Sequence, residues 1–135
     1  MSSLLLRNVV LDGSTVNVLI RGNRFHSISQ SVPAEPADET IDAHGSLAIL
    51  PAFYNAHTHA AMSLLRGYAD DLDLFDWLSN HIWPVEARLT NEDVYAGTRL
   101  AILEMIKSGT VFFNDMYWRG RQVVKAAEAQ AGRHS

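Results

Sequence analysis

Two histidines separated by one residue form the pattern with the clearest chemical potential in this sequence. His57 and His59 stand in the run Asn55-Ala56-His57-Thr58-His59, at the end of an apolar stretch that begins at Phe53. Residues i and i+2 of a β-strand point to the same side, so both imidazoles can reach one metal ion. Neutral imidazole is a good zinc ligand, and the chain has no cysteine to supply a thiolate instead. The motif is short, and two surface histidines in a loop explain the spacing alone at least as well.

The residues before Pro51 predict a small region made of strands. Runs of branched and aromatic side chains are separated by turn pairs such as Asp12-Gly13 and Gly22-Asn23, which are typical of β-hairpins. Pro33 and Pro36 mark a loop. The strands are expected at residues 4–10, 16–20, 25–29, 40–42 and 47–50.

After Pro51 the pattern changes to strands that alternate with helices. Strands are expected at residues 53–57 and 110–114, and helices at residues 72–83, 91–108 and 122–131. Pro84 is expected to stop the first helix. Thr90 and Asp93 are expected to help the second helix begin, and Gly109 to end it. This order predicts an α/β chain in which a small β region leads into βα units with parallel strands.

Composition narrows the class of protein and its partners. The chain has 135 residues, of which 47% are hydrophobic and 19% charged, as in a globular domain. Its formal net charge of −4 gives no reason to expect nucleic acid as a partner. Three leucines near the N-terminus are followed at once by Arg7 and Asn8, which does not resemble a secretory signal, and no apolar run is long enough for a membrane helix. We therefore expect a cytoplasmic protein without membrane association.

Three stretches of the sequence resemble the amidohydrolase superfamily: PAFYNAHTHAAMSLLRGYADDL, NHIWPVEARLT and YAGTRLAILEMIKSGTVFFNDM. They are most similar to its aminohydrolase branch, the 5-methylthioadenosine/S-adenosylhomocysteine deaminases and the related triazine chlorohydrolases. The resemblance runs from about residue 4 onward. It implies that residues 1–50 are the N-terminal part of a composite β-sandwich and that residues 51–135 are the first βα units of a metal-dependent (β/α)₈ barrel. A closed barrel needs eight units in about 250 residues, so the barrel is expected to be incomplete in this chain.

The resemblance also implies roles for particular residues. His57 and His59 would be the first two ligands of a zinc or another divalent transition metal, and Glu86 would lie at the substrate, although composition alone favours a surface glutamate. The family has three further metal ligands, two histidines and an aspartate, on later strands, and its proton-shuttling glutamate also lies later. None of these has a counterpart here, so no catalytic residue is expected within these 135 residues. The sequence departs from the family's usual pattern in two places. Ala52 stands where the family usually has glycine, directly after the proline that precedes the first barrel strand. Residues 111–113 are bulkier than the threonine-rich run that the family usually has there.

Other polar and aromatic residues are expected to have structural roles or a secondary place at the site. Trp77 and Trp83 can stack on a planar ring, with core packing at least as well supported. The remaining histidines are expected outside the metal site, with His81 near the mouth of the barrel: His26, His44, His81 and His134. The acidic run is expected to be a solvated loop and helix N-terminus: Asp70, Asp71, Asp73 and Asp76.

Two classes of function remain open. In the first, the intact parent is an enzyme that deaminates an adenosine-type nucleoside, or carries out another aminohydrolase or dechlorination reaction on a nitrogen ring. Its partner would be a small-molecule substrate, and a metal ion would make hydroxide available near neutral pH. In the second, the chain is a truncated, non-catalytic fragment, held in an oligomer. A homo-oligomer is compatible with both.

Overall fold

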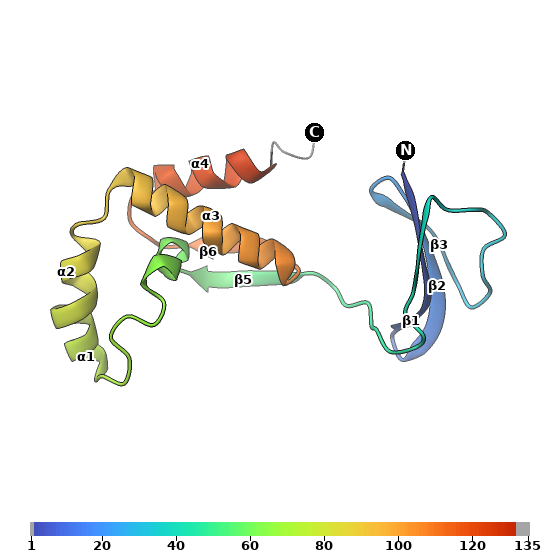
Figure 1. Ribbon diagram of the computed structural model, residues 1–135, viewed down its shortest axis with the longest axis horizontal. Helices are drawn as coiled ribbons and strands as arrows, with labels where there is room; N and C mark the ends of the chain where they lie inside the picture. The colour runs from blue at the N-terminus through green and yellow to red at the C-terminus, as the bar shows by residue number, and fades with distance from the viewer. Residues whose placement is uncertain (1, 132–135) are drawn as a thin grey trace. The chain divides into compact units, whose positions relative to one another are not determined.

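The computed structural model describes residues 2–131. The chain divides into two compact units, Met1–Pro51 and Ala52–Ser135 (Figure 1). The first unit contains four strands, and the second contains the helices and strands that follow them. The second unit alternates strands and helices, so the expected α/β class is confirmed. Within residues 2–131, no helix has the length and apolar character needed to cross a membrane.

The first unit is a four-stranded sheet with the order β3-β2-β1-β4. Its strands are β1 (Ser3–Leu11), β2 (Ser14–Arg21), β3 (Arg24–Ser29) and β4 (Glu39–Asp42). The first three are antiparallel neighbours, whereas β4 runs parallel to β1. The turn between β1 and β2 places Asp12 at φ 49° and Gly13 at φ 78°. Two positive φ angles in a two-residue turn match the twist of the flanking strands, which explains why this pair predicted the hairpin.

The core of the first unit lies against β1 and β2. It consists of Val9, Val16, Val18 and Ala43, with Ile49 packed against them. The strand expected at residues 47–50 is not formed, and that expectation was wrong. This segment makes only two backbone hydrogen bonds to Val10, around an isolated bridge. Pro51 follows directly and has no N–H to extend the pairing.

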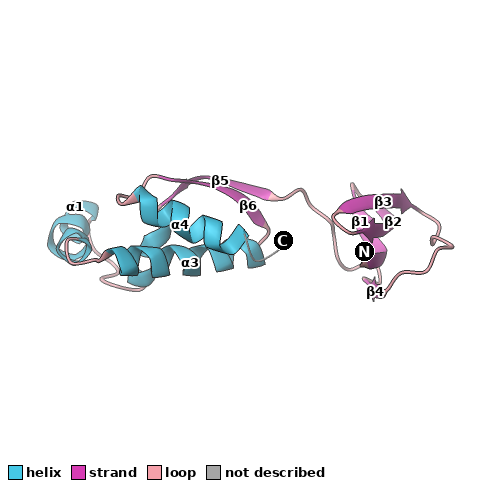
Figure 2. Ribbon diagram, turned by 90° about the horizontal axis from the view of Figure 1, so that it is seen from above, coloured by secondary structure: helices cyan, strands magenta, loops and turns pink. Residues whose placement is uncertain are grey.

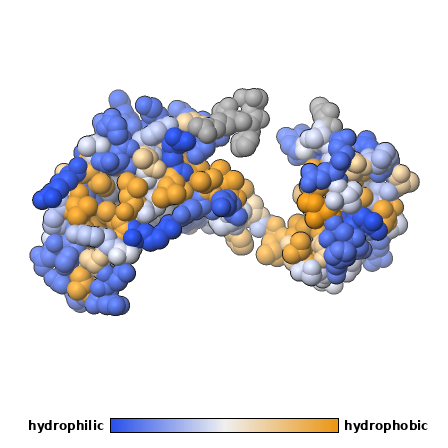
Figure 3. All heavy atoms as spheres, viewed as in Figure 1, coloured by the Kyte–Doolittle hydropathy of each residue, from blue (hydrophilic) through white to orange (hydrophobic). Residues whose placement is uncertain are grey.

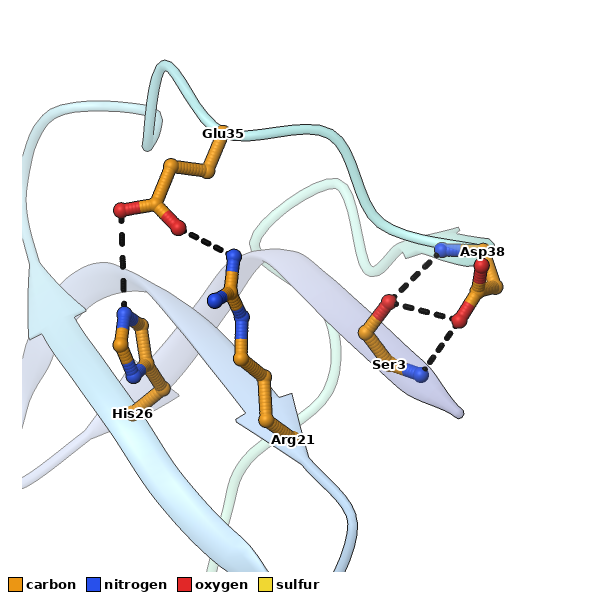
Figure 4. A network of polar contacts seen from close by, with 5 residues as sticks. All are labelled: Ser3, Arg21, His26, Glu35 and Asp38. Carbon is orange, nitrogen blue, oxygen red and sulfur yellow. Dashed lines mark hydrogen bonds and ion pairs between the residues drawn. The ribbon is translucent and has the colours of Figure 1, made fainter. Parts of the chain in front are cut away.

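Side-chain contacts hold the proline-containing loop of the first unit to its sheet (Figure 4). Asp38 accepts hydrogen bonds from the backbone N–H of Ser3 at 2.7 Å and from its hydroxyl at 2.8 Å. These bonds favour the charged form and lower the pKa of Asp38. Glu35 pairs with Arg21 and lies 3.7 Å from His26. His26 therefore lies beside the surface ion pair of Arg21 and Glu35.

The second unit is built on two parallel strands joined by a helical crossover. Its elements are β5 (Phe53–Thr58), η1 (Ala60–Leu65, a 3₁₀ helix), α1 (Leu74–Asp76), η2 (Trp77–Ile82, π-helical), α2 (Trp83–Glu86), α3 (Asn91–Lys107), β6 (Thr110–Asp115) and α4 (Gly120–Ala131). Helix α3 begins with the expected cap, because the Thr90 and Asp93 side chains each bond the other residue's backbone N–H. The helices α3 and α4 lie on one side of the two strands (Figure 2).

The helix predicted to stop at Pro84 continues to Glu86, so that boundary was wrong. The reason is the π-helical turn η2, at whose end the N–H of Trp83 bonds to the carbonyl of Leu78, five residues back. Pro84 then lies at the start of α2, where the missing N–H and fixed φ of proline are tolerated. Because the helix continues, Glu86 lies in the last turn of α2.

Close packing fixes the segment that follows the two histidines. Ala61 of η1 is fully buried and belongs to a core cluster with Val94 and Val123. The Ser63 hydroxyl donates to the backbone carbonyl of Gly97 on α3 at 2.8 Å. A Cβ atom added at Gly97 would lie 2.6 Å from the carbonyl oxygen of Ala61, so glycine allows this close approach.

Hydrophobic side chains also remain exposed on the second unit (Figure 3). On the strands, Phe53 is 55% exposed and Tyr54 73%, while Val111 and Phe112 on β6 are similarly open. A parallel sheet normally has both faces covered. The two strands described here thus have apolar surface that α3 and α4 do not cover.

Candidate active site

His57 and His59 meet at the carboxyl end of β5. His57 lies within the strand and His59 follows its last residue, Thr58. Both side chains are exposed, and their Nε2 atoms lie 3.1 Å apart, with the ring centroids separated by 5.1 Å. The structure therefore brings the two predicted ligands to one point, as i and i+2 residues of a strand should be.

The geometry of this pair fits two ligands of a zinc ion. Two nitrogen ligands at ordinary zinc distances and a tetrahedral angle are about 3.3 Å apart, close to the 3.1 Å between the Nε2 atoms of His57 and His59. In the part of the chain that the structure describes, no group of three or more histidine, aspartate or glutamate side chains is placed to hold a metal. The pair can thus supply two ligands, and a stable site needs further ones.

Asp115, at the end of β6, fixes the chain around the histidine pair. One carboxylate oxygen accepts the backbone N–H of Ala60 at 2.9 Å, immediately after His59. The other accepts the backbone N–H of Tyr117 at 2.6 Å. Sequence reasoning missed Asp115, although its signal was present: a carboxylate directly after a strand that was expected to run parallel to β5.

A pocket of about 440 Å³ connects His59 with Glu86. This volume lies within the range of small-molecule sites. Three indole rings line it, those of Trp77, Trp83 and Trp118. The structure thus brings together the predicted substrate residue Glu86, one predicted ligand and both tryptophans that were considered for ring stacking.

Tyr117 is the second residue of this pocket that sequence reasoning missed. Its side chain is only 7% exposed, and its hydroxyl donates to Oε1 of Glu86 at 2.8 Å. Burial first, and then this hydrogen bond, raise the pKa of Tyr117 far above its usual value. The phenol therefore stays protonated and remains a donor. The aromatic pair Tyr117-Trp118, which begins two residues after the end of β6, was the signal that could have revealed it.

Among the described residues, the other polar residues considered from the sequence do not line this pocket. Asp73 caps α1 by accepting the N–H of Phe75, as expected for a helix N-terminus. His81 packs edge-on against Tyr68, with 6.4 Å between the ring centroids. His44 lies in a turn of the first unit, 3.4 Å from Asp42, and His134 lies outside the described residues. Asp70 and Asp71 line a second, wider hollow of about 960 Å³, which also reaches His59.

Comparison with known proteins identifies the family. Residues 48–133 match the amidohydrolase family. The chain belongs to this family. The expected resemblance is thereby confirmed, and it covers both histidines, Glu86 and the strands that position them.

Individual known proteins are similar to this chain over most of its length. A 5-methylthioadenosine/S-adenosylhomocysteine deaminase from Syntrophomonas wolfei is 60% identical over 96 residues, which cover 71% of this chain and 22% of that protein. The crystal structure of an adenosine deaminase from Xanthomonas campestris with bound zinc has a TM-score of 0.71 and 32% sequence identity to this chain. The match covers 94% of this chain and 31% of the chain in that structure. A triazine hydrolase from Arthrobacter aurescens has a TM-score of 0.70 at 16% identity, which shows a shared fold. This chain therefore spans less than a third of the length of the first two proteins.

Proposed function

We propose that the full-length protein carrying this segment is a zinc-dependent hydrolase of carbon–nitrogen bonds other than peptide bonds. Its reaction is the hydrolytic deamination of an adenosine-type nucleoside, such as S-adenosylhomocysteine or methylthioadenosine. The observation that carries this proposal is the single pocket in which His59, Glu86 and three indole rings meet. The name of the similar Syntrophomonas wolfei protein supports this substrate class.

The two units correspond to two parts of a larger architecture. We assign residues 1–50 to a partial β-sandwich and residues 51–135 to the first strands and helices of a (β/α)₈ barrel. Parallel strands joined through a helix, as β5 and β6 are through α3, are the unit from which such barrels are built. Both His59 and Asp115 stand at carboxyl ends of strands, where barrel active sites lie. The uncovered apolar side chains of β5 and β6 are what neighbouring strands would bury.

His57 and His59 would hold the metal through their Nε2 atoms, with the family's later histidines and aspartate completing the site. When bound, such an ion would lower the pKa of a bound water, so that hydroxide would be available near neutral pH to replace the amino group of the ring, which leaves as ammonia. The residues of this chain have supporting tasks. Asp115 anchors the backbone at Ala60 and thereby holds His59 at the pocket.

Glu86 would recognise the sugar of the substrate. A carboxylate has about four lone-pair positions, and the Tyr117 hydroxyl occupies one of them. The others can accept hydrogen bonds from both vicinal hydroxyls of a ribose. The indole rings of Trp77, Trp83 and Trp118 offer flat apolar faces to a purine. A free base or a chlorotriazine has no ribose for this carboxylate, so Glu86 separates the nucleoside reaction from the alternatives.

A substrate panel on the full-length protein tests the proposal. It contains S-adenosylhomocysteine, methylthioadenosine, adenosine, 2′-deoxyadenosine, guanine, cytosine and a chlorotriazine, each assayed with wild type and with Glu86→Gln. We expect S-adenosylhomocysteine, methylthioadenosine and adenosine to react, and 2′-deoxyadenosine to react poorly. Charge-assisted hydrogen bonds contribute about 1.5–3 kcal/mol each, so Glu86→Gln should lower kcat/KM for adenosine clearly. Equal reaction of adenosine and 2′-deoxyadenosine would contradict the role of Glu86. Turnover of a free base or triazine alone would leave a metal-dependent hydrolase of another substrate class.

A further inference from the structure

Tyr117 contacts both pocket residues to which the proposed function gives a role, His59 and Glu86. Its ring meets the His59 imidazole edge-on, with 6.2 Å between the centroids and an interplanar angle of 86°. Its hydroxyl donates to Oε1 of Glu86 at 2.8 Å. One rigid side chain thus contacts both the metal-ligand histidine and the sugar-binding carboxylate.

Packing and hydrogen bonds hold the Tyr117 ring in place. The ring is 7% exposed and belongs to the core cluster with Ala61 and Val123. Its backbone N–H is held by Asp115 at 2.6 Å, and the second oxygen of that carboxylate binds the N–H of Ala60, next to His59. The Tyr117 hydroxyl is therefore placed by the same framework that places the histidine.

Glu86 has much less support of its own. It ends the short helix α2 and is partly buried. Among the side chains of residues 2–131, only that of Tyr117 makes a hydrogen bond to its carboxylate. A glutamate side chain has several rotatable bonds and loses substantial rotamer entropy when it is held in one conformation. Without the phenol, substrate binding itself would have to restrict the carboxylate.

We propose that Tyr117 is a positioning residue that holds the Glu86 carboxylate at a fixed place relative to His59, and that it thereby strengthens the preference for substrates with free ribose hydroxyls. This inference rests on the proposed function for the role of Glu86. It extends that function by assigning the preference to a pair of residues, one of which does not need to touch the substrate.

The variant Tyr117→Phe in the full-length protein tests this inference because it removes the hydroxyl and keeps the ring. Since a typical hydrogen bond is worth up to about a factor of ten, we expect KM for adenosine to rise roughly tenfold with kcat changed far less. The preference for adenosine over 2′-deoxyadenosine should fall by a similar factor, and zinc content should not change. Binding of the products inosine and 2′-deoxyinosine, measured by calorimetry, gives the same comparison without turnover. Tyr95→Phe is the matched control, since Tyr95 lies on α3 and does not line this pocket.

A double-mutant cycle separates positioning from a general structural effect. Glu86→Ala should weaken adenosine binding, and adding Tyr117→Phe to it should have no further effect on KM. An equal rise of KM in both backgrounds, a loss confined to kcat, or kinetics like those of Tyr95→Phe would overturn the positioning role while the deaminase assignment stands. If wild type neither deaminates adenosines nor binds inosine, the proposed function fails, and this inference fails with it.

Discussion

Replacing Gly97 by alanine should destabilise the segment that carries the histidine pair. The new Cβ would lie 2.6 Å from the carbonyl oxygen of Ala61 and 2.9 Å from Cγ of Leu64. Alanine favours a helix interior over glycine by about 0.8–1.0 kcal/mol. Overpacking costs about 1–3 kcal/mol, and here the upper end applies, because a backbone oxygen cannot rotate away. We therefore expect a net loss of about 2 kcal/mol of unfolding free energy.

The strain should also reach the proposed metal site. The oxygen of Ala61 must move by about 0.4 Å or more to give a contact that proteins tolerate. Ala61 is the second residue of η1, and η1 is tied to His59 by the hydrogen bond from the N–H of Met62 to the His59 carbonyl, at 2.9 Å. We expect zinc affinity to fall together with stability.

The assay is thermal unfolding of the full-length protein, combined with zinc titration of the folded variant. Gly120→Ala is the matched control, because a Cβ at Gly120, the first residue of α4, meets nothing within 4 Å. We expect a melting temperature several degrees lower for Gly97→Ala and one that is unchanged or slightly higher for Gly120→Ala. If Gly97→Ala is as stable as wild type and binds zinc equally well, the close contact between η1 and α3 does not exist in the protein.

Three further predictions concern the site and the chain. His57→Ala or His59→Ala in the full-length protein should greatly reduce bound zinc in elemental analysis, since each removes one of few ligands; equal metal content in all three proteins would disprove the ligand assignment. Asp115→Asn leaves one oxygen for two backbone N–H donors, so it should lower the free energy of unfolding by about 1–3 kcal/mol in denaturant unfolding. Unchanged stability would refute the structural role of the two hydrogen bonds that Asp115 accepts. Residues 1–135 expressed alone should not deaminate adenosine and should aggregate through uncovered strands, as light scattering would reveal; metal-dependent turnover by the purified fragment would contradict this.

Local signals predicted most of the strands and helices well. The hairpin turn at Asp12 and Gly13 and the cap formed by Thr90 and Asp93 depend only on neighbouring residues, and both are present. Two expectations failed at places where distant contacts or unusual backbone geometry decide the structure. Residues 47–50 looked like a strand but make only two bonds to β1. Pro84 looked like a stop but follows a π-helical turn that lets the helix continue.

The sequence by itself determined the family and the α/β class. It also determined the convergence of His57 and His59, because a spacing of two along a strand is a local property. Only the tertiary structure decided what surrounds that pair. The hydrogen bond from Ala60 to Asp115 spans 55 positions, and that from Tyr117 to Glu86 spans 31. Both form only when α3 returns the chain so that β6 pairs with β5 in the observed register, which includes two shifts. No local periodicity encodes that register, because it is set by the packing of side chains far apart in the chain.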